Sequence, residues 1–169
     1  MRTQKTLSLF TLALAYFFFF SNTVLAANWI LVYGNDEIKF YFDADSICYG
    51  LKFSESENDY IIDTTKISYY EKGVFSQDIA SVNDDYDNTI TGMNINSWIF
   101  SKTVSLDAKS FVYNNYRGYD INGKLVYHRN KKIKSDFSPN SIESGILTTV
   151  IEYAHRHHDK VVDNTYGRF

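Results

Sequence analysis

Short runs of aromatic and branched residues, separated by Asn, Asp, Ser and Gly, follow one another along most of the chain. The clearest runs are WILVY (29–33), IKFYF (38–42), YII (60–62), KISYY (66–70), GVFS (73–76) and INSWIFSKTVSL (95–106). Runs of this kind between turn-forming residues are typical of β-strands. The GNDE turn after the first run makes a hairpin of 29–33 and 38–42 the simplest arrangement.

A second hairpin is predicted at 109–129, KSFVYNNYRGYDINGKLVYHR. Asn122 and Gly123 offer the two positive φ angles of a tight two-residue primed turn between Tyr-rich arms. Sequential strands with short connections form antiparallel sheets, so an antiparallel sheet of about six strands is expected. The polar stretch 83–88, NDDYDN, is expected as an insertion between strands.

The apolar period changes after residue 141. The apolar positions there are Ile142, Ile146, Leu147, Val150, Ile151 and Ala154. Their spacing places them on one face of an amphipathic helix, about 142–157, laid across the sheet. Pro139 is suited to the helix start, and Ser138 or Asn140 can cap it. The fold class is therefore α+β, and the tail 159–169 is expected to be extended or loose.

The N-terminal segment reads as a secretory signal peptide. Arg2 and Lys5 precede an uncharged run from 6 to 27 that ends in TVLAA, before Asn28. Cleavage is expected after residue 26 or 27, so the chain divides into a signal peptide (1–26), a single domain (27–158) and a tail (159–169). An uncleaved membrane anchor is the alternative. The cleaved protein is expected to be exported, with no stable membrane span.

The charge of the exported part argues against binding to nucleic acid. The chain has 17 basic and 20 acidic residues, and residues 1–26 contain two of the bases and no acid, which leaves 15 against 20, a net charge of −5. Proteins that bind phosphate backbones need Lys and Arg in excess. The basic stretch HRNKKIK (128–134) is interpreted as a charged, solvated turn, with a local basic patch as the alternative.

The stretch FYFDADSICYG (40–50) brings Asp43, Asp45 and the chain's lone cysteine, Cys48, to the end of a strand. The two acids are expected to accept hydrogen bonds from amides of the following turn. Burial is the expected fate of Cys48, with an intermolecular disulfide or a reactive thiol as alternatives. A lone cysteine allows no intrachain disulfide.

Metal binding and catalysis have weak signals only. His155, His157 and His158 could contribute to a metal site, with Glu152, but a cationic helix end that complements the helix dipole is preferred. The acidic stretch 83–88 lacks the glycine and glutamate positions of a calcium loop. The sequence has no nucleophile, metal-protease, phosphate-loop or dithiol motif, so we expect neither enzyme activity nor a cofactor.

Aromatic residues make up 17% of the chain, more than one small core should need. Exposed tyrosines beside Asn and Arg are typical of protein-binding surfaces, and the stretch VYNNYRGY contains three tyrosines and an arginine of this kind. These candidate binding residues are Tyr113, Tyr116, Arg117 and Tyr119. Ordinary cross-strand pairing of aromatic side chains is the alternative.

The order of several short motifs resembles the surface-adhesin protein E family of exported bacterial proteins. The motifs are Trp29, Phe42-Asp43 with Ser46-Ile47, Tyr119-Asp120 with Gly123-Lys124, and Phe137, Pro139, Ser141 and Glu143. The similarity spans about residues 28–155. It implies an antiparallel sheet of about six strands with a C-terminal helix on its concave face.

The resemblance also implies an adhesin-like role: a protein partner, with host extracellular-matrix proteins such as laminin and vitronectin as candidates, and a homodimer as a candidate assembly. Two features depart from the family prototype. The helix has no cysteine, so packing rather than a disulfide must hold it, and no cysteine follows the apolar run to accept a lipid anchor. The alternative is a periplasmic structural or accessory protein without a host ligand, so the expected location is the periplasm or the cell surface.

Overall fold

The computed structural model describes residues 27–84, 88–107 and 109–168, and within these the side chains outside 78–93. The predicted signal peptide, 1–26, lies outside the described residues, and its cleavage remains a prediction.

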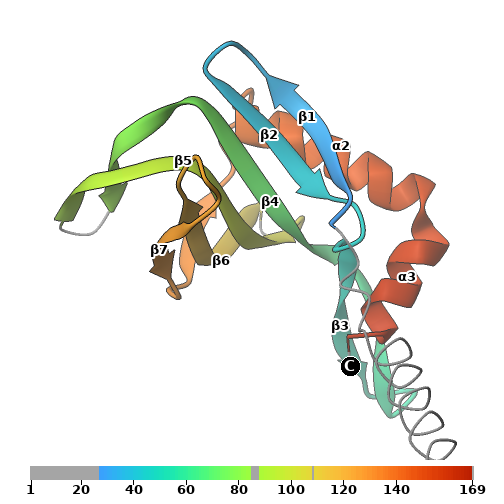
Figure 1. Cartoon of the computed structure of the whole chain (residues 1–169). Helices are drawn as coiled ribbons and strands as arrows, with labels where there is room; N and C mark the ends of the chain where they lie inside the picture. Colours follow the sequence, from blue (N-terminus) through green and yellow to red (C-terminus); the bar gives the residue numbers. More distant parts are fainter. Residues whose placement is uncertain (1–26, 85–87, 108, 169) are drawn as a thin grey trace, which may run out of the picture.

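An antiparallel sheet forms the body of the molecule (Figure 1). Its strands are β1 (Trp29–Gly34), β2 (Ile38–Asp43), β3 (Cys48–Ser54), β4 (Asp59–Asp84), β5 (Asn88–Ser105), β6 (Ser110–Tyr119), β7 (Leu125–Arg129) and β8 (Ile133–Asp136). The order is β1-β2-β4-β5-β6-β7, with β3 paired to β4 and β8 to β6. The expected class is correct, but eight strands replace the predicted six or so.

Two strands are much longer than the sequence pattern suggests. The runs 60–62, 66–70 and 73–76 belong to the single strand β4, which first pairs with β3 and then lies between β2 and β5. Polar residues interrupt the apolar runs without ending the strand: the Asp63 carboxylate accepts a hydrogen bond from the Thr65 amide at 3.1 Å. Of the polar stretch 83–88, the first two residues end β4 and Asn88 begins β5, while 85–87 lie outside the described residues, so the predicted insertion is not tested there.

The β6–β7 connection differs from the predicted two-residue turn. Only Gly123 has positive φ, at 78°, and Asn122 does not. The Gly123 amide donates to the Asp120 carbonyl oxygen at 3.0 Å, and the Asp120 carboxylate accepts from the amides of Asn122 and Lys124 at 2.9 and 2.8 Å. The aspartate side chain thus stabilises a longer loop with one glycine in the left-handed region.

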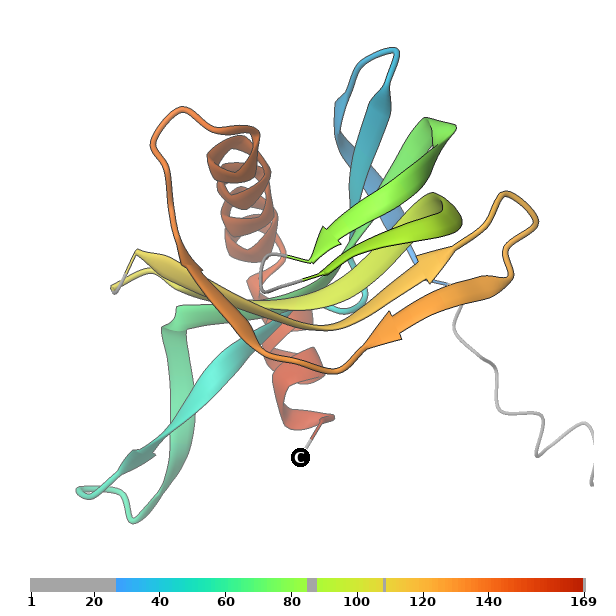
Figure 2. The same ribbon diagram turned by 90° about the vertical axis from the view of Figure 1, so that its left-hand side faces the viewer.

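The predicted helix is α2 (Ile142–Arg156), which lies over the concave face of the curved sheet (Figure 2). Its N-cap is Ser141, whose hydroxyl accepts from the Ser144 amide at 3.1 Å, and not Ser138 or Asn140. Ile146, Val150 and Ala154 are buried from its apolar face. They join a core that includes Phe42, Ala44, Ile47, Tyr49, Ile67, Tyr69, Val104 and Phe111.

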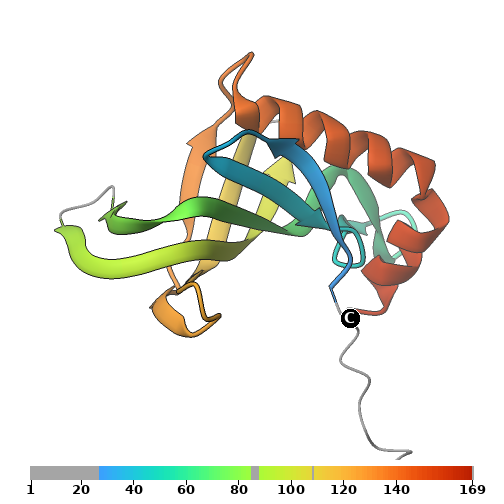
Figure 3. The ribbon, with the colours of Figure 1, turned by 45° about the horizontal axis from the view of Figure 1, so that its top comes forward.

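The C-terminal tail is not extended or loose, as the sequence suggested, but forms a second helix, α3 (His158–Tyr166), packed beside β3 (Figure 3). Val161 and Thr165 are fully buried. The Thr165 hydroxyl accepts a hydrogen bond from the Tyr49 amide at 2.9 Å, and the Asn164 amide group donates to the carbonyl oxygen of Ile47 at 2.9 Å. Polar side chains of the tail thus satisfy backbone groups of 45–49, and these hydrogen bonds dock α3 beside β3.

Candidate functional site

An aromatic groove lies on the concave face beside the first turn of α2. Its lining residues come from five strands and the helix: Phe40, Glu71, Trp98, Phe100, Phe111, Tyr113, Tyr116, Ser135 and Glu143. The groove has a volume of about 340 Å³. Six of its nine residues are aromatic; Trp98, Phe100 and Phe111 are largely buried, whereas Phe40, Tyr113 and Tyr116 are partly exposed. We call this surface the aromatic groove.

The rings of the groove are ordered by mutual stacking. Trp98 and Phe100, on β5, lie nearly parallel with centroids 4.7 Å apart, and Tyr116 stacks on Phe100 at 6.0 Å. Tyr113 contacts Phe100 at 5.4 Å, and Phe40 meets Trp98 edge-on at 5.6 Å. These geometries are the favourable ones for aromatic pairs, and they hold the ring faces in fixed orientations.

A β-bulge in β6 brings Tyr113 and Tyr116 to the same face. Residues three apart in a regular strand point to opposite faces. Here Ser101 pairs with Asn114 and Ile99 with Arg117, so β6 has one more residue than β5 between these pairs. Asn115, with φ of 54°, takes up the additional residue, and Tyr116 turns into the groove.

The absence of a side chain at Gly73 leaves space for the indole of Trp98 on the sheet. Gly73 pairs with Trp98 across β4 and β5, and a Cβ on this glycine would lie only 2.4 Å from two carbons of the indole ring. The indole therefore lies directly against the backbone of β4. A side chain at position 73 would displace it from the groove.

A buried cation and two carboxylates lie together at one end of the groove. The Lys102 ammonium donates to Glu71 Oε2 at 2.8 Å and contacts Glu143 Oε1 of α2. The Lys102 and Glu71 side chains are 2% and 1% exposed, whereas that of Glu143 is 34% exposed. The same ammonium lies 4.7 Å from the ring centre of Phe111 and 5.5 Å from that of Phe100. This contact ties the helix to the sheet, so α2 is held by an ion pair as well as by packing.

Burial shifts the protonation of the acids and phenols around this cluster. Desolvation raises the pKa of Glu71 above its usual value, with Lys102 opposing and Glu143 reinforcing the shift. Burial also raises the pKa of Tyr69, whose hydroxyl donates to Glu71 Oε2 at 3.3 Å, and that of Tyr116. The phenols are therefore neutral hydrogen-bonding groups at physiological pH.

The four candidate residues of β6 divide between the two faces of the sheet. Tyr113 and Tyr116 line the groove. Arg117 and Tyr119 pair with Ile99 and Ser97, which alternate with the groove residues of β5, so they lie on the opposite face. A single binding surface made of all four residues therefore does not form.

The predicted binding residues all lie on β6, so the sequence did not identify the site residues that other elements contribute. These residues are Phe40, Glu71, Trp98, Phe100, Lys102 and Glu143. A signal was present. In WIFSKTV the alternate positions Trp98, Phe100, Lys102 and Val104 share one face, which places a lysine on an apolar face. Glu71 likewise alternates with Tyr69 and Gly73. Two opposite charges at buried strand positions indicate an ion pair, but pairing them needs the strand register.

The histidines predicted as weak metal ligands have other contacts. His158 Nδ1 lies 3.2 Å from the Tyr49 hydroxyl, and the ring of His157 lies 4.2 Å from that of Tyr153. His155 is exposed in the last turn of α2. Within residues 27–84, 88–107 and 109–168, no group of three His, Cys, Asp or Glu side chains could hold a metal ion.

The stretch 43–48 has a structural role. Asp43 Oδ1 accepts from the amides of Asn28 and Asp45 at 3.0 and 3.1 Å, as expected of a turn carboxylate. Asp45 instead pairs with Lys160 of α3 at 2.5 Å. Cys48 is buried and free, with Arg168 Nη1 at 3.1 Å from its sulfur. Burial raises the pKa of this thiol, which Arg168 partly opposes, so it is a poor nucleophile.

The basic stretch 128–134 runs from the end of β7 into β8, and Lys131, Lys132 and Lys134 are exposed. This placement agrees with a solvated, charged connection.

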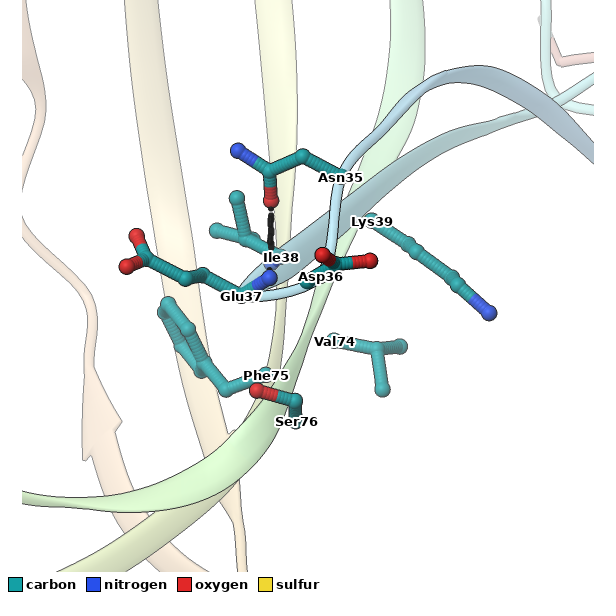
Figure 4. Close-up of a pocket in the computed structure, with 8 residues that line it drawn as sticks. All are labelled: Asn35, Asp36, Glu37, Ile38, Lys39, Val74, Phe75 and Ser76. Carbon is teal, nitrogen blue, oxygen red and sulfur yellow. Dashed lines mark hydrogen bonds between the residues drawn. The ribbon is translucent and has the colours of Figure 1, made fainter.

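A second pocket, of about 320 Å³, lies between the β1–β2 turn and β4 (Figure 4). The Asn35 side chain closes the turn by accepting from the amides of Glu37 and Ile38 at 2.9 and 2.8 Å. The carboxylates of Asp36 and Glu37 point apart, so they do not converge on a ligand (Figure 4). We interpret this pocket as a crevice of the turn.

Fold and site together define a sheet-and-helix protein with an aromatic groove on the concave face. Among solved structures, the chain is similar to two of protein E from Haemophilus influenzae. The one from the non-typeable organism has a TM-score of 0.43 and 12% identity, over 83% of this chain and 84% of that one. The other has a TM-score of 0.44 and 10% identity, over 77% and 88%. These are structures of the protein whose family the sequence motifs resemble.

No protein-family model and no curated protein matches the sequence. Among the described residues, no helix is long and apolar enough to cross a membrane.

Proposed function

We propose that the chain is an exported, non-enzymatic binding protein of the adhesin type, and that its aromatic groove receives a protein partner. The observation that supports this most strongly is the gathering of six aromatic side chains around a groove that α2 leaves open at its first turn. Large, rigid rings with polar edges supply contact area at low entropic cost, and they are enriched in protein interfaces. Host extracellular-matrix proteins such as laminin and vitronectin are the partners that the motif resemblance suggests.

The domain that carries this function is proposed to span 27–158, completed by α3. Because Thr165 and Asn164 bond the backbone of 45–49, the segment beyond 158 belongs to the folded unit rather than to a dispensable tail.

The proposal has two parts that one set of experiments separates. Surface labelling of intact cells tests display: an adhesin is labelled before the outer membrane is opened, whereas a periplasmic accessory protein is labelled only afterwards. Binding of the purified mature chain to immobilised laminin and vitronectin tests the partner class. Labelling only after opening, together with no saturable binding to either protein, would replace the adhesin role with the periplasmic one.

A further inference from the structure

We infer that the aromatic groove selects a cationic side chain, and that its preferred occupant is an arginine of the protein partner. The inference deepens the proposed function and rests on it for the source of the arginine. The preference of the groove for a cation rests on the geometry of the site alone.

Charge is the first reason. Two carboxylates, Glu71 and Glu143, line the groove, and one ammonium, that of Lys102, lies between them. With both acids ionised, this end of the groove has a net charge of −1. An anionic ligand would be repelled there, and a neutral apolar ligand would cover the partly exposed Glu143 carboxylate without pairing it.

The second reason is that a cation, the Lys102 ammonium, already lies against aromatic rings at this site. The Lys102 ammonium lies over the faces of Phe100 and Phe111, within the range in which a ring face attracts a positive charge. The stack continues outward from Phe100 to Trp98 and Tyr116, with interplanar angles of 12° and 16°. Trp98 and Phe100 are largely buried, whereas Tyr116 is partly exposed and lines the groove, so the stack runs from the buried lysine to a ring that a ligand can reach.

Glu143 supplies the polar anchor. Lys102 contacts one of its oxygens, Oε1, and the side chain is 34% exposed at the edge of the groove. A carboxylate has two oxygens and about four lone-pair directions, so it can accept further hydrogen bonds. A guanidinium stacks flat on aromatic rings and presents several donors to a carboxylate, which an ammonium cannot do with the same geometry. The groove volume of about 340 Å³ is sufficient for one such side chain and lies at the lower end of the range for ligand pockets.

The test compares a charged probe with its neutral isostere. The mature chain is titrated with N-acetylarginine methylamide and, separately, with N-acetylcitrulline methylamide, which has nearly the same shape without the charge. The chain has two tryptophans. Trp98 lines the groove, whereas Trp29 lies on β1 with Lys72 over its ring. The indole NMR signal of Trp29 is therefore an internal control.

We expect a saturable shift of the Trp98 indole signal with the arginine probe, no shift of the Trp29 signal, and at least about tenfold weaker binding of the citrulline probe. Tyr116→Leu and Glu143→Gln should each weaken arginine binding several-fold. The matched control Tyr60→Leu, at an exposed tyrosine outside the groove, should leave it unchanged.

Equal binding of the two probes, or no shift at Trp98, overturns the inference, and this comparison needs no variant. Saturable arginine binding by a chain that binds no matrix protein would retain the cation site and reject the proposed function. If the chain binds a matrix protein but binds the arginine and citrulline probes equally, the proposed function is retained and the cation site is rejected.

Discussion

The Lys102 ammonium lies 2.8 Å from the Glu71 carboxylate, with both side chains at most 2% exposed, below the first turn of α2. Lys102 also contacts Glu143 of the helix, so a single cation joins two strands and the helix. Removing it would leave a buried carboxylate without its partner. Lys102→Met is therefore expected to lower the free energy of unfolding by about 3–5 kcal/mol, measured by urea denaturation. The double variant Lys102→Met/Glu71→Gln should recover a large part of the loss; a double variant no more stable than Lys102→Met would show that the ion pair is not the cause.

Stability should also depend on pH through Glu71. Burial raises the pKa of Glu71 above the ordinary 4.5. The folded state then binds a proton more readily than the unfolded state, so the contribution of this group to stability is greatest at low pH and is lost as pH rises through the raised pKa. The free energy of unfolding of the wild type is expected to fall, relative to Glu71→Gln, as pH rises from about 4.5. Parallel pH profiles of the two proteins would contradict the assignment.

The bulge at Asn115 gives a backbone prediction. A β-branched residue is strained at the observed φ of 54°, whereas glycine is not. Asn115→Val should destabilise the protein by about 1–2 kcal/mol in thermal or urea unfolding. Asn115→Gly, which also removes the Asn115 side chain and its contact with His128, is the matched control and should cost much less. Equal losses would assign the effect to the side-chain contact and not to the backbone.

The α3 helix should contribute to stability through Thr165. Its buried hydroxyl accepts from the Tyr49 amide and donates to the Val161 carbonyl oxygen at 2.7 Å. Thr165→Val keeps the shape and leaves the amide without this partner, so a loss of about 1–3 kcal/mol is expected in urea unfolding. Thr165→Ser, which keeps the hydroxyl, should retain more stability than the valine variant. The opposite order would show that methyl packing, not the hydrogen bond, docks the helix.

Local patterns were enough to predict the class of the fold. Short aromatic runs with close connections indicated antiparallel strands, and the spacing from Ile142 to Ala154 indicated the helix observed as α2. Strand length was harder to predict, because a polar residue such as Asp63 ends an apolar run without ending the strand, which stays paired with β3 at Gly50. The helix α3 was missed because its stabilising contacts are made to residues more than 100 positions away, such as that of Thr165 with Tyr49.

The site was only partly predictable for a similar reason. Tyr113 and Tyr116 were recognised from composition, but simple alternation would have placed them on opposite faces. The left-handed conformation of Asn115 reverses that result, and one sequence does not fix the position of a bulge. Glu71, Lys102 and Glu143 come from three elements, so only the register of β4 and β5 and the docking of α2 bring their charges together.

The most direct test of the aromatic groove as the binding surface compares two tyrosine variants of the mature chain on immobilised laminin and vitronectin. Tyr116→Leu removes a ring of the groove, and Tyr60→Leu removes an exposed ring elsewhere on the sheet. Both variants should first show the wild-type circular dichroism spectrum and thermal midpoint within a few degrees. We predict that Tyr116→Leu weakens saturable binding by about tenfold or more, as expected for an aromatic residue central to an interface, while Tyr60→Leu binds like the wild type. Undiminished binding by Tyr116→Leu, or an equal loss in both variants, would contradict the assignment of the groove.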